Sequence, residues 1–242
     1  MIEVALTTVL LICAGLLLQS FRQLQRVELG FDVTNVLTAR ISLPDARYAS
    51  PQQAAAFFEQ LTERTRRIPG VVAVSAISSL PLSGNQFAVS FGVEGASLIG
   101  IGEFRVISPD YFRTMGTRLI KGRDFTKRDG LQAPAVVIIN ETLAERFFPG
   151  ENAVGRRISF EGTSDNQRWR EIVGVVPDVK WQRPDQKPTP EAYLPHAQVP
   201  FVPYAREPFY MTLAVRTATD PHRIIKALEV EVHALDKDLP LL

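Results

Sequence analysis

Few side chains in this sequence have the types and spacing that catalysis needs. A hydrolase with a serine nucleophile, a histidine base and an acid could draw only on Ser83, His196 and Asp178. No G-x-S-x-G elbow surrounds Ser83, which follows Leu80-Pro81-Leu82 in a turn context. The pattern favours a structural turn at Ser83-Gly84, and we predict that the chain is not an enzyme.

The histidines and loop acids do not have metal-ligand spacing. A zinc site needs several nitrogen or sulfur ligands that converge, whereas the three histidines are far apart in the sequence. Two of them fall on one predicted helix about three turns apart, and we expect all three at the surface. We expect no metal and no cofactor. The histidines are His196, His222 and His233, and the acids beside loop glycines are Asp124, Asp129 and Glu151.

Phosphate-binding and modification motifs are also weak. No G-x-x-x-x-G-K-[ST] motif occurs, and Gly100-Ile101-Gly102 is followed by Arg105 where a third glycine is needed. Any ATP must therefore be hydrolysed by another protein. Asn140-Glu141-Thr142 matches a glycosylation sequon, but Asn140 is better explained as a helix cap.

Composition and charge restrict the class of protein. The 242 residues are 45% hydrophobic and 22% charged, as in a folded globular chain. The formal net charge of +1 indicates no nucleic-acid partner, and the single cysteine, Cys13, cannot form an intramolecular disulfide. A basic cluster at a helix end complements the helix dipole, and we interpret it as a solvated face. Its members are Arg64, Arg66 and Arg67.

The N-terminal residues are the most unusual part of the sequence. From Met1 to Phe21 only Glu3 is charged, and about 20 helical residues suffice to cross a membrane. We predict a membrane span that continues as a stalk over Gln19–Val27. A cleaved signal peptide and a buried core helix are the alternatives, but no Lys or Arg precedes the run and it has no polar stripe. Its orientation stays open on the residues alone.

A β-α-β pattern follows the span. Val36–Leu43 and Val71–Leu80 read as strands. Between them, Ser50-Pro51-Gln52-Gln53 has the features of a helix start, and Pro69-Gly70 stops the helix. The apolar face of this helix consists of Ala54, Phe57, Phe58, Leu61, Thr65 and Ile68.

A matching unit lies at the C-terminal end. Residues 209–216 alternate as a half-buried strand does, and Asp220-Pro221 caps a helix that we expect to be followed by a final strand. Two such units in one sheet predict a ferredoxin-like, split β-α-β lobe whose last strand is cut off. The apolar face of the helix consists of Ile224, Ile225, Leu228, Val232 and Leu235.

A different region separates the two units. Eight of the 17 prolines fall between Pro177 and Pro208, which predicts extended backbone there. Short helices are expected near Pro109 and after Asn140. We predict an α+β fold with span and stalk at 1–27 and a core domain at 28–242, in which lobe 1 covers about 28–86 and 207–242 and an inserted lobe 2 covers 87–206. The strands expected in lobe 2 are Phe87–Val93, Phe104–Ile107, Ala135–Ile139 and Ile172–Val176.

An ordered series of motifs, spread over the whole chain, resembles FtsX-like, MacB-type ABC-transporter permeases. It is most similar to the large duplicated permeases of soil bacteria. The motifs are AGLLLQSFRQLQRVELGFDVTNVLTARISLP (14–44), DARYASPQQAAAFFEQLTERTRRIPGV (45–71), SSLPLSG (78–84), ISPDYFRTMGTRLIKGRDF (107–125), VVIINETLAERFFPGENAVGRRI (136–158), REIVGVVPDVK (170–180) and EAYLPHAQ (191–198).

The resemblance implies a helix in the bacterial inner membrane that leads into a two-lobed periplasmic core domain. In that family, ATP hydrolysis by a cytoplasmic subunit moves the membrane helices, and the stalk passes the motion to the periplasm. The implied partners are this ATP-binding subunit, a second permease half or second copy, and a periplasmic adaptor. The alternatives are a membrane-tethered sensor or adaptor domain that binds a ligand or peptide, and the hydrolase considered above.

Overall fold

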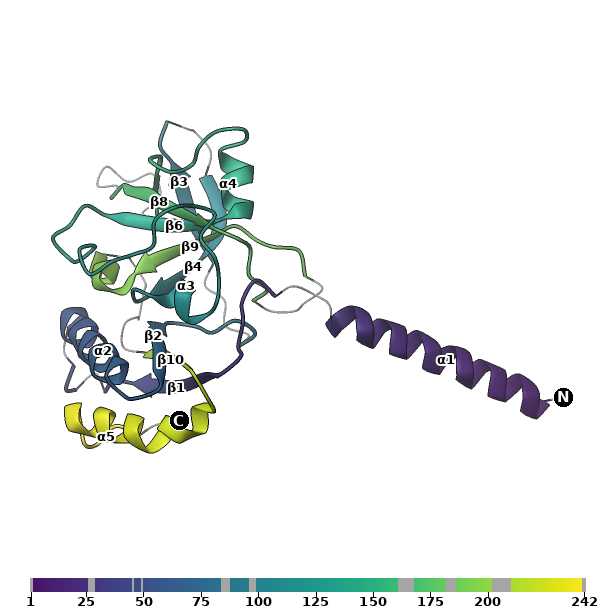
Figure 1. The fold of residues 1–242 in the computed structure, drawn as a ribbon. Coiled ribbons are helices and arrows are strands. Elements are labelled where there is room, and N and C mark those ends of the chain that lie inside the picture. The colour runs from purple at the N-terminus through teal and green to yellow at the C-terminus, as the bar shows by residue number, and fades with distance from the viewer. Residues whose placement is uncertain are drawn as a thin grey trace.

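The computed structural model describes residues 2–25, 29–44, 46–48, 50–83, 88–95, 99–160, 168–181, 186–201 and 210–240. A long N-terminal helix projects from a mixed α/β domain (Figure 1). The helices are α1 Ile2–Gln25, α2 Pro51–Arg66, α3 Tyr111–Thr114, α4 Glu141–Phe147 and α5 Ile225–Leu235, with 3₁₀ turns η1 His196–Phe201 and η2 Pro221–Ile224. The strands are β1 Val36–Ser42, β2 Val71–Ile77, β3 Ala88–Val93, β4 Ile99–Ile107, β5 Lys121–Gly122, β6 Val136–Asn140, β7 Arg157–Ser159, β8 Arg170–Val176, β9 Glu191–Pro195 and β10 Tyr210–Thr217.

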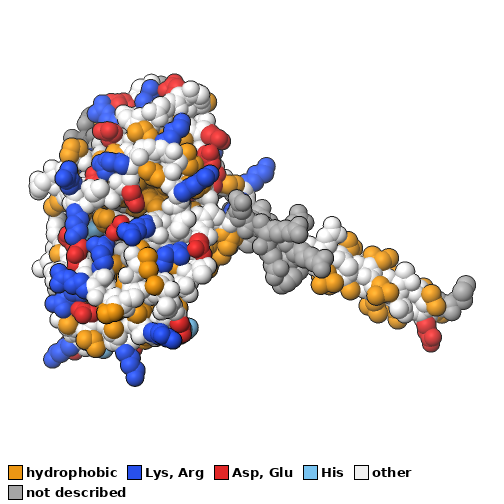
Figure 2. All heavy atoms as spheres, viewed as in Figure 1, with side chains coloured by type: hydrophobic (Ala, Val, Ile, Leu, Met, Phe, Trp, Pro, Cys, Tyr) orange, Lys and Arg blue, Asp and Glu red, His pale blue; other side chains and the backbone are white. Residues whose placement is uncertain are grey.

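Helix α1 extends away from the domain and carries its apolar side chains on the outside (Figures 1 and 2). The window Ile2–Gln19 has a mean hydropathy of 2.1, and none of it is buried. Thr7 and Thr8 donate their hydroxyls to carbonyls one turn earlier, at 2.8 and 2.7 Å, so their polar groups are satisfied within the helix. By length and composition, α1 is a candidate membrane span. The predicted stalk is helical through Gln25, and its last two residues lie outside the described part of the chain.

Helix α2 has the predicted start and apolar face. Ser50 accepts a hydrogen bond from the Gln53 N–H at 3.3 Å, Pro51 occupies the first turn, and Gly70 follows with a φ of 90°. Its inward side chains have between 0 and 8% of their surface exposed, and full burial of a side chain such as Phe58 contributes about 1.5–3 kcal/mol. The buried face of the helix comprises Ala54, Phe57, Phe58, Leu61, Thr62 and Thr65. Ile68, expected on the same helix, is buried just after its end at Arg66.

Strands β1, β10 and β2 form an antiparallel part of the sheet in that order. Because β10 lies between β1 and β2, the β1-α2-β2 unit and the β10-α5 unit interleave. The prediction of a half-buried β10 is wrong: Thr212 and Ala214 are 7 and 0% exposed, as buried as Leu213. Helix α2 packs against β2, which neighbours β10, and α3 contacts both β2 and β10, so this central part of the sheet is covered.

The other strands close into a ring, β4-β3-β7-β8-β6-β9, in which β9 returns to pair with β4. One residue pair, Ile77 with Ile107, joins β2 to this ring. The expected strands of the region are present, although Phe87 lies outside the described residues. The sequence did not indicate β5, β7 or β9 as strands. Strand β9 lies in the proline-rich stretch, and its five residues acquire strand geometry through pairing with β4 and β6.

Two further boundaries differ from expectation. Strand β2 ends at Ile77 rather than Leu80. The Ser78 N–H donates to the Val106 carbonyl oxygen of β4 at 2.9 Å, but the Val106 N–H donates to the Ser78 hydroxyl at 3.1 Å, so the regular backbone ladder stops there. After α5, residues 236–240 form a turn and coil rather than a strand, and Leu239 is buried against the core.

Candidate functional site

The chain that follows α1 is held by the domain from its first described residues. We call residues 29–35 the linker segment. The carbonyl oxygen of Leu29 accepts a hydrogen bond from the Lys180 N–H at 3.0 Å. The Gly30 carbonyl oxygen accepts one from the Thr117 hydroxyl at 2.9 Å. The linker segment is therefore tied to the segment after β8 and to the turn after α3.

Arg216 on β10 holds the same linker segment from a third direction. Its guanidinium donates to the carbonyl oxygens of Asp32, Thr34 and Thr114 at 2.6, 2.9 and 2.8 Å. It also lies 3.2 Å from the Asp32 carboxylate. The Asp32 N–H donates in turn to the Met115 carbonyl oxygen at 2.7 Å. One planar cation thus joins β10, the end of α3 and the linker segment.

Electrostatics favour this arrangement. Hydrogen bonds from Thr34 lower the pKa of Asp32, and the charge of Arg216 lowers it further, so the carboxylate is ionised at neutral pH. The Arg216 side chain is 17% exposed, which leaves its bonds partly shielded from water, whereas Asp32 is 53% exposed. The three carbonyl contacts, which do not titrate, carry most of the attachment.

We call the contacts of the linker segment with Arg216, with the turn after α3 and with the segment after β8 the junction. Two glycines allow the backbone segments to approach closely there. A Cβ on Gly30, where φ is 81°, would lie 2.2 Å from the Asp178 carbonyl oxygen. A Cβ on Gly116, where φ is 68°, would lie 2.9 Å from the Cβ of Asp32. Both positions need a left-handed backbone and have no room for a side chain. The close approach to Asp178 gives Gly30 a packing role where the chain enters the domain.

The segment that binds Leu29 is itself anchored on α4. Asp178 accepts hydrogen bonds through Oδ1 from Asn140 Nδ2 at 2.6 Å and from the Thr142 N–H at 3.1 Å. Its Oδ2 accepts from the Thr142 hydroxyl at 2.8 Å. Asn140 is 1% exposed. The junction therefore connects the outgoing chain to the strand ring through α4, as well as to β10 through Arg216.

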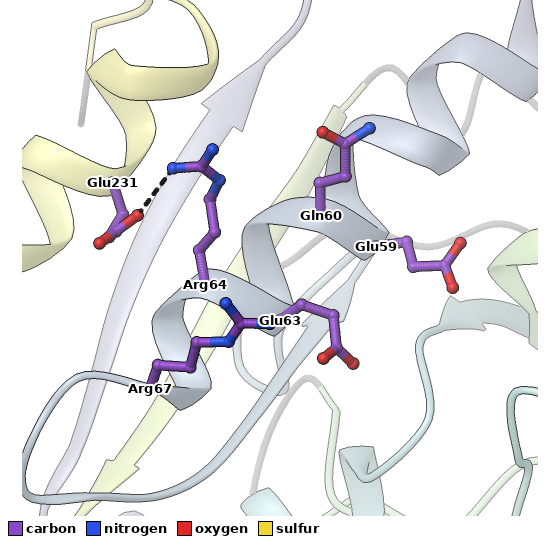
Figure 3. A pocket seen from close by; sticks show the side chains of 6 residues that line it. All are labelled: Glu59, Gln60, Glu63, Arg64, Arg67 and Glu231. Atoms are coloured by element: carbon purple, nitrogen blue, oxygen red, sulfur yellow. Dashed lines mark hydrogen bonds and ion pairs between the residues drawn. The ribbon is translucent and has the colours of Figure 1, made fainter.

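A separate hollow of about 490 Å³ lies between α2 and α5 (Figure 3). Arg64 bridges the two helices across it through a 3.2 Å ion pair with Glu231. The hollow is open and all its lining side chains are polar or charged, whereas small-molecule sites are mostly enclosed and apolar. It is lined by Glu59, Gln60, Glu63, Arg64, Arg67 and Glu231.

The architecture is shared with a known family. A sequence model described as MacB-like periplasmic core domain matches residues 1–230. The chain belongs to this family. It is an ABC-permease periplasmic core domain of the MacB and FtsX-like type.

The relatives agree with this assignment. The macrolide export ATP-binding/permease protein MacB of Aggregatibacter actinomycetemcomitans is 32% identical over 111 residues, which are 46% of this chain and 15% of that protein. The chain therefore matches only a small part of the length of this curated relative.

Solved structures of two periplasmic or extracellular domains and of one permease domain share the fold. The periplasmic region of MacB from Actinobacillus actinomycetemcomitans superposes with a TM-score of 0.58 at 18% identity, over 88% of this chain and 90% of that one. The extracellular domain of the ABC-type transporter YknZ from Gram-positive bacteria superposes with a TM-score of 0.53 at 18% identity, over 85% of this chain and 100% of that one. A domain of a putative permease from Porphyromonas gingivalis superposes with a TM-score of 0.53 at 16% identity, over 87% of this chain and 90% of that one.

In this MacB-like domain the three residues of the hydrolase hypothesis do not form a catalytic group. Ser83 Oγ lies 2.9 Å from Ser79 Oγ, and Asp178 is bonded at the start of α4. His196 is 5% exposed, and its Nδ1 has no hydrogen-bond partner within the described part of the chain. Burial lowers the pKa of His196 to about 4, so it is neutral at pH 7.

The placement of the histidines needs correction. His196 is buried rather than at the surface, because η1 packs against α2 and the ends of β4 and β9. His222 lies in η2 and not on the same helix as His233, because the Asp220-Pro221 start forms a 3₁₀ turn before α5 begins. His222 Nδ1 lies 2.8 Å from Asp220.

The loop acids and the basic cluster have structural partners. Asp129 accepts two 2.8 Å hydrogen bonds from Arg123, Asp124 accepts from the Phe125 N–H, and Glu151 pairs with Arg156. Within the described ranges, no three His, Cys, Asp or Glu side chains converge. In the basic cluster, Arg64 pairs with Glu231, and Arg66 pairs with Glu63 and Asp110.

The sequence did not indicate which residues hold the linker segment. In the sequence, Arg216 is one polar residue of an alternating strand, and residues 178–181 belong to a proline-rich region. The available signal was a single arginine on a strand that is otherwise apolar or uncharged. A charged side chain on a central strand indicates a specific partner, but the identity of that partner depends on tertiary contacts.

Proposed function

We propose that this chain is the extracytoplasmic part of an ABC-transporter permease, in which the linker segment passes motion of the membrane helix into the domain. One observation carries the proposal: directly after an apolar helix, the chain is hydrogen-bonded to β10, to the end of α3 and to the segment after β8. A displacement that reaches Leu29 strains these bonds or moves the elements that make them.

The proposal includes partners that the chain itself does not contain. ATP would be hydrolysed by a cytoplasmic ATP-binding subunit, and the helices would act with a second permease half or a second copy of the chain. A periplasmic adaptor would receive the motion. The described residues offer no catalytic group for ATP hydrolysis, and the family assignment supports these roles.

We also propose the division of the chain into span and stalk (1–27) and core domain (28–242). Lobe 1, about 28–86 and 207–242, would be a ferredoxin-like split β-α-β unit, and lobe 2, 87–206, the inserted ring. The order β1-β10-β2 under α2 and α5 supports the first, and the single residue pair between β2 and β4 supports a boundary there. The sensor alternative has less support, because the hollow between α2 and α5 is open and its lining side chains are polar or charged.

The membrane topology is the first test. We expect that Gln132→Cys, an exposed position, is labelled by a membrane-impermeant maleimide in intact cells when Cys13 is replaced by serine. An extracytoplasmic domain is accessible to the reagent from outside the inner membrane, once it has passed the outer membrane. Labelling that appears only after the inner membrane is disrupted would place the domain in the cytoplasm and exclude the proposal. The Cys13→Ser chain without the new cysteine controls for background.

Transmission through the stalk is tested in the full-length permease. We take macrolide tolerance as the readout, from the name of the macrolide export relative MacB. Two glycines inserted after Gln23 are expected to abolish this tolerance in a complemented deletion strain, because they uncouple α1 from the linker segment. The matched control places two glycines after Gly150, in an exposed turn, and should retain tolerance. Membrane amounts of both variants are compared by immunoblot. Full tolerance in the stalk variant would contradict force transmission by this route.

A further inference from the structure

A group of buried charges lies next to the junction, on the paired strands β4 and β9. Glu103, Arg105 and Glu191 are 7, 1 and 1% exposed. Glu103 lies opposite Glu191 in the parallel ladder, and Arg105 lies opposite Tyr193, so all four side chains emerge on one face. Charged side chains are seldom buried without direct partners. The pairing within this group therefore matters.

The group contains two carboxyls and one cation. Arg105 pairs directly with Glu103, donates to the Phe104 carbonyl oxygen at 3.0 Å and stacks over the Trp181 ring at 4.3 Å. Glu191 Oε2 accepts instead from neutral donors, Trp181 Nε1 at 2.5 Å and the Tyr193 hydroxyl at 3.1 Å. The Arg105 guanidinium is thus paired with the Glu103 carboxylate, whereas no cation is bonded to the Glu191 carboxyl among the described residues.

Trp181 links this buried group to the linker segment. Its neighbour Lys180 donates the backbone hydrogen bond to Leu29, and the Trp181 carbonyl oxygen accepts one from the Leu82 N–H at 2.7 Å. Because Lys180 and Trp181 are neighbours, a backbone opening of this segment would separate the indole from Glu191 and the Lys180 N–H from Leu29 together.

We propose that Glu191 carries a proton in the folded domain, and that loss of this proton favours opening of the segment 178–181 and release of Leu29. The functional consequence rests on the proposed role of the junction in transmission. Opening would hydrate the carboxylate, which has no bonded cation while it is buried. The proton on Glu191 would thus set how firmly the outgoing chain is held.

The surroundings of Glu191 support this assignment. The pKa of Glu191 is raised to about 8, and burial is the main cause. The charge of Arg105 and the hydrogen bonds from Trp181 and Tyr193 oppose this shift, and the charge of Glu103 acts in the same direction as burial. Tyr111 of α3 faces the same group, and burial raises its pKa far above neutrality, so it stays uncharged. On the backbone side, the Glu191 N–H donates to Asn140 Oδ1 at 2.9 Å.

The direction of the pH effect follows from these values. In an open state the carboxyl titrates near its ordinary pKa of about 4.3, and in the closed state near 8. The closed state binds the extra proton, so closure is complete at low pH and is weakened as pH rises through this window. Opening becomes up to about tenfold more favourable for each pH unit in the window and levels off above it.

The test is hydrogen–deuterium exchange of the full chain in detergent micelles from pH 5 to 9, corrected for the intrinsic pH dependence of amide exchange. For peptides that contain Lys180, we expect protection to fall at least tenfold between pH 6 and 8 in the wild type. The Glu191→Gln variant, which is neutral at every pH, should show no such fall. Glu229→Gln, an exposed change on α5, should behave as the wild type.

A second variant keeps the test decisive if Glu191→Gln folds poorly. Glu103→Gln frees Arg105 to pair with Glu191, so the fall in protection should move to lower pH. Protection that is independent of pH in the wild type, or an unchanged midpoint in Glu103→Gln, would overturn the proposal. Because the readout needs no transport, failure of force transmission and failure of this proton-dependent closure are separate results.

Discussion

Replacing Asn140 by alanine is expected to lower the free energy of unfolding by about 3–5 kcal/mol. The side chain is 1% exposed and makes four hydrogen bonds. Nδ2 donates to Asp178 and to the Thr189 carbonyl oxygen, and Oδ1 accepts from the N–H groups of Leu143 and Glu191. Alanine leaves buried donors and acceptors without partners and removes the cap of α4. Urea unfolding of the full chain in micelles measures the effect.

A matched control and a pH test make this prediction specific. Asn152→Ala removes an exposed side chain whose single acceptor contact is long, at 3.4 Å, and should change stability by less than about 0.5 kcal/mol. Asn140→Asp keeps both accepted bonds but places a second carboxyl against Asp178. Since burial and like charge raise its pKa, this variant should regain stability below about pH 4 and lose it as pH rises. Equal stability of Asn140→Ala and Asn152→Ala would refute the role assigned to Asn140.

Replacing Arg216 by methionine is expected to cost about 2–3 kcal/mol of stability. Methionine keeps the length of the side chain but removes the donors to Asp32, Thr34 and Thr114. Part of the loss is recovered because the site is partly open to water. We also expect faster hydrogen exchange at the Asp32 amide, which reports the loosened linker segment directly.

The same change on the neighbouring strand provides the control. Arg40 on β1 is exposed and makes no side-chain hydrogen bond or ion pair among the described residues, so Arg40→Met should stay within about 0.5 kcal/mol of the wild type. Arg216→Lys should fall between the two, because an ammonium lacks the planar fork that reaches three carbonyl oxygens. If Arg216→Met is as stable as Arg40→Met, the arginine does not fasten the linker segment.

Local features of the fold were accessible from the sequence. The apolar face of α2 follows from a 3.6-residue period, and its limits follow from Ser50-Pro51 and Gly70, all of which act within a few residues. The exposure of α1 agrees with the absence of a polar stripe. Asn140 was also identified correctly as a cap, because the capping contact to Leu143 is three residues away.

Non-local pairing was not accessible. Strands β5 and β7 are two and three residues long, so their own pattern is too short to identify them. Strand β9 is as long as β6, but it follows Pro190 and ends at Pro195 in the proline-rich stretch, which predicts no strand by itself. They become strands through partners far along the chain, such as β4 for β9. The burial of both faces of β10 was missed for the same reason, since it depends on α3 packing over the sheet.

The sequence by itself determined the apolar N-terminal helix, the strands and amphipathic helices of the β1-α2-β2 and β10-α5 units, and a set of motifs sufficient to indicate the family. These properties depend on composition and short-range periodicity. Only the tertiary structure decided where the outgoing chain is held, by bringing Arg216, Thr117 and Lys180 around residues 29–35. Those contacts span from 87 to 184 residues in sequence, and no local preference of the chain encodes which groups will meet.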